Sequence, residues 1–208
     1  MQLVNSLSRR KMLVSGAIAG LSGALTLSAI KPSQGTSDNN SHDAEILNNA
    51  LYYEHQAIWA YGVAAGKLSN SDVGNTVKAI ALKNQADHKA HRDTLAEVIT
   101  SLGASPVEAE DSYDLSSYLD QGEGNLDSDV NIAKLALALE VDAAIAYTQE
   151  IAKLKTPALI TAGASIGSDE SAHATAIRAA FIALGTPIDY VPASFISADT
   201  RKNWILTV

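Results

Sequence analysis

Six glutamate and histidine residues occupy positions that the surrounding helical pattern otherwise fills with apolar side chains. Buried carboxylates and imidazoles need partners, because an unpaired buried charge costs several kcal/mol. The chain has no cysteine, so a metal held by these residues would have oxygen and nitrogen ligands, which suit iron, manganese or zinc. The six candidates for metal ligands are Glu54, His88, His91, Glu140, Glu170 and His173.

The spacing of these residues supports the metal hypothesis. Glu170 and His173 form an E-x-x-H pair, which places a carboxylate and an imidazole one helical turn apart on the same face. His88 and His91 have the same spacing, and Gln85 lies three residues before His88. The sequence leaves open which of these two histidines is the ligand. Two further carboxylates, Glu54 and Glu140, are expected to be capable of bridging two metals.

Four long helical patterns must position these side chains. Apolar residues recur at steps of three and four in each pattern, which is typical of helices with one buried face. About 25 residues separate the second pattern from the third, a length that favours a crossover between parallel neighbours. The last segment contains two prolines, and we expect it to be an extended tail packed on the bundle. The four helices are expected at about 43–68, 71–102, 129–153 and 156–184, and the tail at 186–208.

The two halves of the chain repeat each other. E-x-x-A-x-x-A-Y occurs at Glu54–Tyr61 and again 86 residues later at Glu140–Tyr147. Asp87–His91 is echoed by Asp169–His173 after 82 residues. The repeat predicts a pseudo-twofold axis that brings the six candidates to one point. Tyr61 and Tyr147 would then donate to the glutamates, although plain core tyrosines are an alternative.

With these residues identified, the sequence resembles the ferritin-like superfamily of di-iron carboxylate four-helix bundles. Within it, the sequence is most similar to an exported bacterial ferritin-like family of unknown function. The resemblance covers about residues 43–185 and implies an all-α bundle, at 41–185, with a long crossover between helices two and three. It also implies a dinuclear iron or manganese site, formed by a glutamate or an E-x-x-H pair on each helix. The chain matches this pattern at Glu54, Glu140, Glu170 and His173.

Helix two departs from the family pattern. The expected glutamate is replaced by Gln85 if His88 is the ligand histidine, or by His88 itself if His91 is. One carboxylate is therefore missing, which predicts at most slow oxidation by oxygen or peroxide, and one bound ion is an alternative to two. Gln85, Tyr61 and Tyr147 are expected next to the ligands rather than among them.

The N-terminal 40 residues are predicted to be an export signal and a flexible segment. Arg9 and Arg10 precede a weakly hydrophobic stretch rich in Ala, Gly and Ser, which resembles a twin-arginine signal. We expect the twin-arginine (Tat) machinery to carry the chain to the periplasm or another extracytoplasmic space. Cleavage is expected between Ala29 and Ser41, which leaves no permanent membrane anchor. An uncleaved, membrane-tethered form is the alternative.

The overall charge limits the classes of partner that the protein is expected to bind. Twenty-three acidic residues stand against 15 basic ones, a formal net charge of −8, which argues against nucleic-acid binding. Two classes of function fit the sequence: a metalloprotein that performs redox chemistry or buffers metal ions, and a ferritin-like envelope or stress protein with a degenerate site. A homo-oligomer is compatible with both.

Overall fold

The structure, a computed structural model, describes residues 37–208, and the predicted export signal lies mainly outside this range. The chain is all-helical over the described residues, which confirms the predicted fold class. None of the helices within 37–208 combines the length and the apolar composition needed to cross a bilayer. The four long helices are α2 (Ser37–Ala65), α3 (Asp72–Ser101), α5 (Asp129–Ile151) and α6 (Pro157–Ala183), and the two short ones are α4 (Ser116–Asp120) and α7 (Arg201–Trp204).

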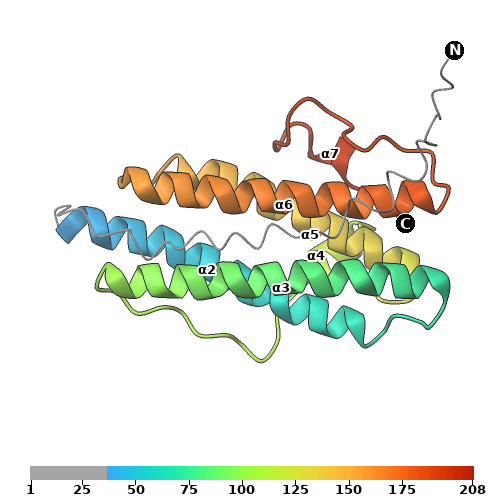
Figure 1. The fold of residues 1–208 in the computed structure, drawn as a ribbon, viewed down its shortest axis with the longest axis horizontal. Helices are drawn as coiled ribbons and strands as arrows, with labels where there is room; N and C mark the ends of the chain where they lie inside the picture. Colours follow the sequence, from blue (N-terminus) through green and yellow to red (C-terminus); the bar gives the residue numbers. More distant parts are fainter. Residues whose placement is uncertain (1–36) are drawn as a thin grey trace, which may run out of the picture.

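The long helices form two antiparallel hairpins packed side by side (Figure 1). α2 packs chiefly against α3, and α5 packs chiefly against α6. The segment between α3 and α5, which contains α4, returns along the bundle, so that α5 runs parallel to α3 and antiparallel to α2 (Figure 1). This is the crossover that its length predicts.

Local sequence signals explain where the helices begin and end. The Ser71 and Ser128 side chains accept hydrogen bonds from the amides of Gly74 and Asn131, and thereby cap α3 and α5. Gly103 and Gly185 follow α3 and α6 with φ of 87° and 92°, the left-handed conformation that glycine adopts without strain. The ends of α3, α5 and α6 lie within two residues of the predicted boundaries, whereas α2 begins at Ser37, six residues before its predicted start and within the segment predicted to be flexible.

Two short helices were not predicted. α4 forms within the crossover, and α7 is a single turn in the tail that sequence analysis expected to be extended. Side-chain contacts hold α7 in place, because Arg201 donates hydrogen bonds to both Glu123 of the crossover and Asp142 of α5. Arg178 of α6 donates to the backbone carbonyl of Asp189 in the tail. A four-residue turn fixed by such contacts has too few residues to show a period of its own.

The core consists of two apolar clusters separated by a polar layer. On α3, Val77 belongs to one cluster and Leu95 to the other, and His88 lies between them. On α6, Ile166 and Ala174 likewise flank the polar layer on its two sides. Apolar packing above and below lowers the local dielectric constant and strengthens the electrostatic interactions within the layer.

Candidate metal centre

All six candidate ligands meet at the centre of the bundle, one each from α2 and α5 and two each from α3 and α6. They form two overlapping groups of four, and within each group one ligand atom per residue lies within 4.8 Å of the others. Both groups contain His88 and Glu170, as expected of two adjacent metal positions. The first group is Glu54, His88, His91 and Glu170, and the second is His88, Glu140, Glu170 and His173.

Glu170 is the carboxylate shared by the two groups. Its side chain is fully buried, and neither carboxylate oxygen has a hydrogen-bond partner among the described residues. The sequence predicted that Glu54 and Glu140 are capable of bridging two metals, whereas each of these belongs to one group only. A buried carboxylate without a hydrogen bond is costly in the absence of a cation, so Glu170 is the best-placed bridging ligand.

Two tyrosines donate hydrogen bonds to Glu54 and Glu140, the two glutamates that each belong to one group only. The Tyr147 hydroxyl donates to Glu54 Oε1 at 2.5 Å, and the Tyr61 hydroxyl donates to Glu140 Oε1. The expected tyrosine–glutamate contacts are therefore present, each between opposite halves of the chain. Asn84, which sequence analysis did not single out, donates from its buried amide to Glu140 Oε1 at 3.1 Å. These hydrogen bonds occupy one carboxylate oxygen each of Glu54 and Glu140.

Both histidines of α3 reach the cluster. His88 Nδ1 lies 2.7 Å from Glu54 Oε2, and His88 Nε2 lies 3.4 Å from Glu140 Oε1. His91 Nδ1 lies 3.1 Å from Glu170 Oε1 but has no partner in hydrogen-bonding geometry. Both histidines of α3 therefore lie in the cluster, at different positions. In the 82-residue repeat His91 matches His173, whereas His88 matches Glu170.

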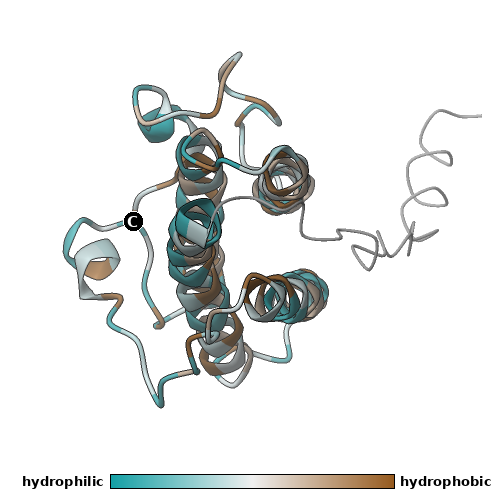
Figure 2. Cartoon of the chain, turned by 90° about the vertical axis from the view of Figure 1, so that its left-hand side faces the viewer, coloured by the Kyte–Doolittle hydropathy of each residue, from teal (hydrophilic) through white to brown (hydrophobic). Residues whose placement is uncertain are grey.

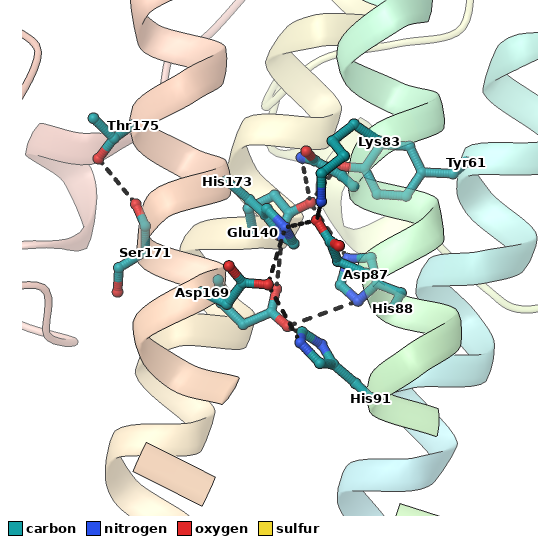
Figure 3. A network of polar contacts seen from close by, with 12 residues as sticks. Tyr61, Lys83, Asp87, His88, His91, Glu140, Asp169, Ser171, His173 and Thr175 are labelled. Carbon is teal, nitrogen blue, oxygen red and sulfur yellow. Dashed lines mark hydrogen bonds and ion pairs between the residues drawn. The ribbon is translucent and has the colours of Figure 1, made fainter. Parts of the chain in front are cut away.

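Two aspartates lie beside the candidate ligand histidines His91 and His173 (Figure 3). His91 Nε2 lies 3.3 Å from Asp169, and His173 Nε2 lies 3.3 Å from Asp87. In each ring Nε2 faces the aspartate, which leaves Nδ1 facing the cluster, the arrangement by which carboxylates orient metal-binding histidines. Both aspartates are members of the 82-residue repeat, but the sequence alone predicted no role for them.

Gln85 does not lie among the groups that contact the ligands. Its side-chain amide donates to the Ile58 carbonyl of α2 at 2.9 Å, and its oxygen accepts from Lys89. The residue therefore ties α3 to α2 on the outer side of the site. Its position three residues before His88 suggested the ligand face, but the long side chain turns towards the neighbouring helix instead.

The charges of the cluster are strongly coupled. Burial alone would raise the pKa of Glu54, but the neighbouring imidazoles of His88 and His91 outweigh it and hold this pKa at about 2. Burial alone would lower the pKa of His91, but Asp169, Glu170 and Glu54 raise it to about 12. The pKa of His173 is raised to about 10, since Glu140 and Glu170 outweigh the effect of burial. Without a metal, the imidazoles therefore carry the positive charge that Glu54 and Glu140 require, whereas burial raises the pKa of Glu170.

The donor set fits transition-metal ions. Three carboxylates and three imidazoles supply only oxygen and nitrogen atoms, and the two overlapping groups supply four donors each. The unbonded atoms, His91 Nδ1 and both oxygens of Glu170, lie in the first group, and Glu170 also belongs to the second. A helical bundle with a buried carboxylate–imidazole cluster of this kind could hold a metal between its facing helices.

Comparison with known proteins agrees with this class. The family model described as the ferritin-like domain matches residues 42–183, so the chain belongs to that family. A crystal structure of a conserved hypothetical protein from Mycobacterium tuberculosis is similar in fold, with a TM-score of 0.55 and 23% identity. The similarity covers 76% of this chain and 99% of that one. No match was found among curated proteins.

Proposed function

We propose that the chain is an exported metalloprotein that binds two iron or manganese ions between Glu54, Glu140 and the residues of α3 and α6. The observation that carries this proposal is the Glu170 carboxylate, which is fully buried and has no hydrogen bond to either oxygen. It belongs to both groups of potential ligands. A cation on each side would give both oxygens a partner.

The number of carboxylates among the candidate ligands also limits the redox chemistry that we propose for the site. Two divalent ions bring four positive charges against three carboxylates, and oxidation to the trivalent state adds two more. A bound redox pair would supply electrons to oxygen or peroxide, but a fourth carboxylate that would stabilise the oxidised state is replaced by His88. We therefore propose metal buffering or slow oxygen- or peroxide-dependent oxidation. Zinc would fit the same donors without redox activity.

A second candidate function has an observation of its own. Each of the three histidines lies within ion-pairing distance of a carboxylate, so protonated imidazoles can balance the buried charges without a metal. A ferritin-like envelope or stress protein with a degenerate site would have this arrangement. The two functions differ in one measurable property, which is metal-dependent stability.

Metal content and metal-dependent melting test the proposal. We expect purified protein to take up one or two ions per chain and to melt at a higher temperature with iron or manganese, since a ligand of the folded state stabilises it. Glu170→Ala should abolish both effects, whereas the matched control Glu97→Ala, an exposed carboxylate on α3, should leave them unchanged. Wild-type protein that binds no ion and shows no shift would establish the degenerate-site alternative.

Export is proposed from the sequence alone. Arg9 and Arg10 carry this part of the proposal, which places the protein in the periplasm or another extracytoplasmic space after transport by the twin-arginine machinery. Replacing both arginines by lysine should retain the protein in the cytoplasm. Normal export of that variant in cell fractionation would refute the assignment.

A further inference from the structure

A cavity of about 370 Å³ separates α2 from α5 beside the candidate metal centre. Short side chains on the facing surfaces of both helices create it, because alanine leaves space where a larger residue would fill the gap. These alanines follow the 86-residue repeat, in that Ala57 and Ala60 match Ala143 and Ala146. The cavity is therefore built into the sequence of both halves. The alanines that line it are Ala50, Ala57, Ala60, Ala64, Ala136, Ala143 and Ala146.

The crossover contributes a further wall. Leu115, Tyr118 and Leu126 line the same cavity, and they come from the segment before, within and after α4. Figure 2 shows this short helix and its flanking loops along one side of the bundle. The space is thus bordered by three chain segments and is not a bare helix face, which distinguishes a small-molecule pocket from a flat docking surface.

The inner end of the cavity lies at the metal centre. Glu54, Glu140 and His88 line it, together with the two tyrosines that donate to the glutamates. A molecule in the cavity would therefore be in contact with candidate metal ligands. The pocket and the metal centre share a wall, so occupancy of one is expected to affect the other.

The lining defines the chemical class of the occupant. Most of its side chains are apolar or aromatic, and none of the described residues that line it is lysine or arginine. The charged groups it does contain are mainly carboxylates, which repel anions. An apolar cavity of about 150 Å³ accommodates benzene, so this cavity is large enough for a molecule of roughly twice that size.

We propose that this cavity binds one small, uncharged and mainly apolar organic molecule, with one end against the Glu54 and Tyr147 side of the metal centre. Binding itself depends only on the cavity. The influence of the bound molecule on a metal rests on the function proposed above.

Binding is measured first in the metal-free full-length protein. N-phenyl-1-naphthylamine, a neutral fluorescent probe, should bind saturably at one molecule per chain, and 1-decanol should displace it. Decanoate, which has the same chain length and a negative charge, should compete at least tenfold less well at pH 8. Equal competition by the alcohol and the acid would overturn the proposed class of ligand.

Matched variants locate the site. Ala60→Leu and Ala146→Leu each place three more carbon atoms in the cavity and should weaken probe binding at least tenfold. Ala176→Leu, the same change at an exposed position of α6, should leave it unchanged. Melting curves identify any variant that fails to fold, and the ligand comparison in wild-type protein then decides the matter.

Two results separate this proposal from the metal function. Probe binding without metal uptake would uphold the cavity and refute the metal centre, whereas metal uptake without probe binding would do the reverse. If both bind, 1-decanol should change the visible spectrum of the cobalt-substituted protein. A concentration-dependent dimer that Ala60→Leu disrupts, together with no probe binding, would show that the space is an interface between two copies and would overturn the proposal.

Discussion

The hairpin of α2 and α3 and the hairpin of α5 and α6 each contribute three of the six candidate ligands. Glu54 matches Glu140, and each accepts a hydrogen bond from a tyrosine of the other half. His91 matches His173, and each faces an aspartate. The remaining pair differs, since α3 has His88 where α6 has Glu170. The comparison shows that the two halves share these tyrosine and aspartate contacts but differ by one carboxylate in the cluster.

The halves are also tied to each other in matching ways. Asp43 of α2 accepts hydrogen bonds from the backbone amides of Lys155 and Thr156, which precede α6. Asp129, 86 residues after Asp43, accepts from the amide of Ser69, which precedes α3. The tyrosine–glutamate bonds cross between halves in the same manner. The metal centre therefore depends on docking of the two hairpins, because neither hairpin completes it alone.

The largest effect is expected when the difference between the halves is removed. His88→Glu should raise metal affinity at least tenfold, because an added charge about 4 Å from a cation contributes on the order of 4 kcal/mol at an effective dielectric constant of 20. The same change should lower the melting temperature of the metal-free protein, as four carboxylates would then face two imidazoles. His88→Gln, which removes the imidazole without adding charge, is the control. Unchanged affinity in His88→Glu would show that His88 does not occupy a ligand position.

Exchanging His88 and Glu170 between the halves tests whether the two halves of the site are equivalent. Glu170→His alone should abolish tight binding, because the shared carboxylate is lost. Adding His88→Glu to it should restore affinity to within about tenfold of wild type, since the double variant has the original donor set in mirrored halves. Calorimetric metal titration of the single and double variants measures this rescue, and its absence would contradict the proposed equivalence of the halves.

The metal-free protein should lose stability as the pH rises above neutrality. The pKa of His173 is raised from 6.5 to about 10, so its contribution to stability is complete below pH 6.5 and is lost as the pH approaches 10. The pKa of Glu54 is lowered from 4.5 to about 2, so its contribution is present above pH 4.5 and is lost as the pH falls towards 2. Melting temperatures should therefore be highest between about pH 4.5 and 6.5. A melting temperature that rises from pH 6.5 to 10 would contradict the charge assignment.

The aspartates behind the ligand histidines should have equal and smaller effects. Asp87→Asn and Asp169→Asn each weaken the partner that orients a ring, and such changes lower metal affinity by about 10- to 100-fold. Metal titration of both variants against the exposed control Asp93→Asn tests this. Affinities that match the control would show that the aspartates do not orient the ligands.

The smallest effects are expected at the contacts between hairpins. Asp43→Ala leaves two backbone amides without their partner and should cost about 1–3 kcal/mol of unfolding free energy. Asp129→Ala removes the equivalent contact at a less buried position and should cost less. Denaturant titration of the metal-free variants measures both values, and the reverse order would refute the link between burial and the cost of the lost partner.

The helices and the ligand layer could be predicted because both follow one repeating pattern. Glutamate or histidine within an apolar stripe, on four helices, is a signal that periodicity detects directly. Asp87 and Asp169 gave a weaker signal, since residues at the edge of a stripe look like ordinary surface charges. Their recurrence after 82 residues was the only indication that they act together.

Other features depend on three-dimensional detail that spacing does not determine. The rotamer of Gln85 directs its amide to α2, although its position suggested the ligand face. Glu170 belongs to both groups of potential ligands, whereas Glu54 and Glu140 each belong to one and accept a hydrogen bond from a tyrosine. The spacing of the three glutamates does not show this difference. The cavity between α2 and α5 was missed because alanines on facing helices also fit close packing, and only the distance between the helices distinguishes the two cases.

Anomalous diffraction from crystals of the iron- or manganese-loaded protein tests the central claim most directly. The account predicts two peaks about 3.5–4 Å apart, one between Glu54, His91 and Glu170 and the other between Glu140, His173 and Glu170. Glu170 should contact both peaks. Loaded crystals with no peak at Glu170, or with metal only at surface carboxylates, would contradict it.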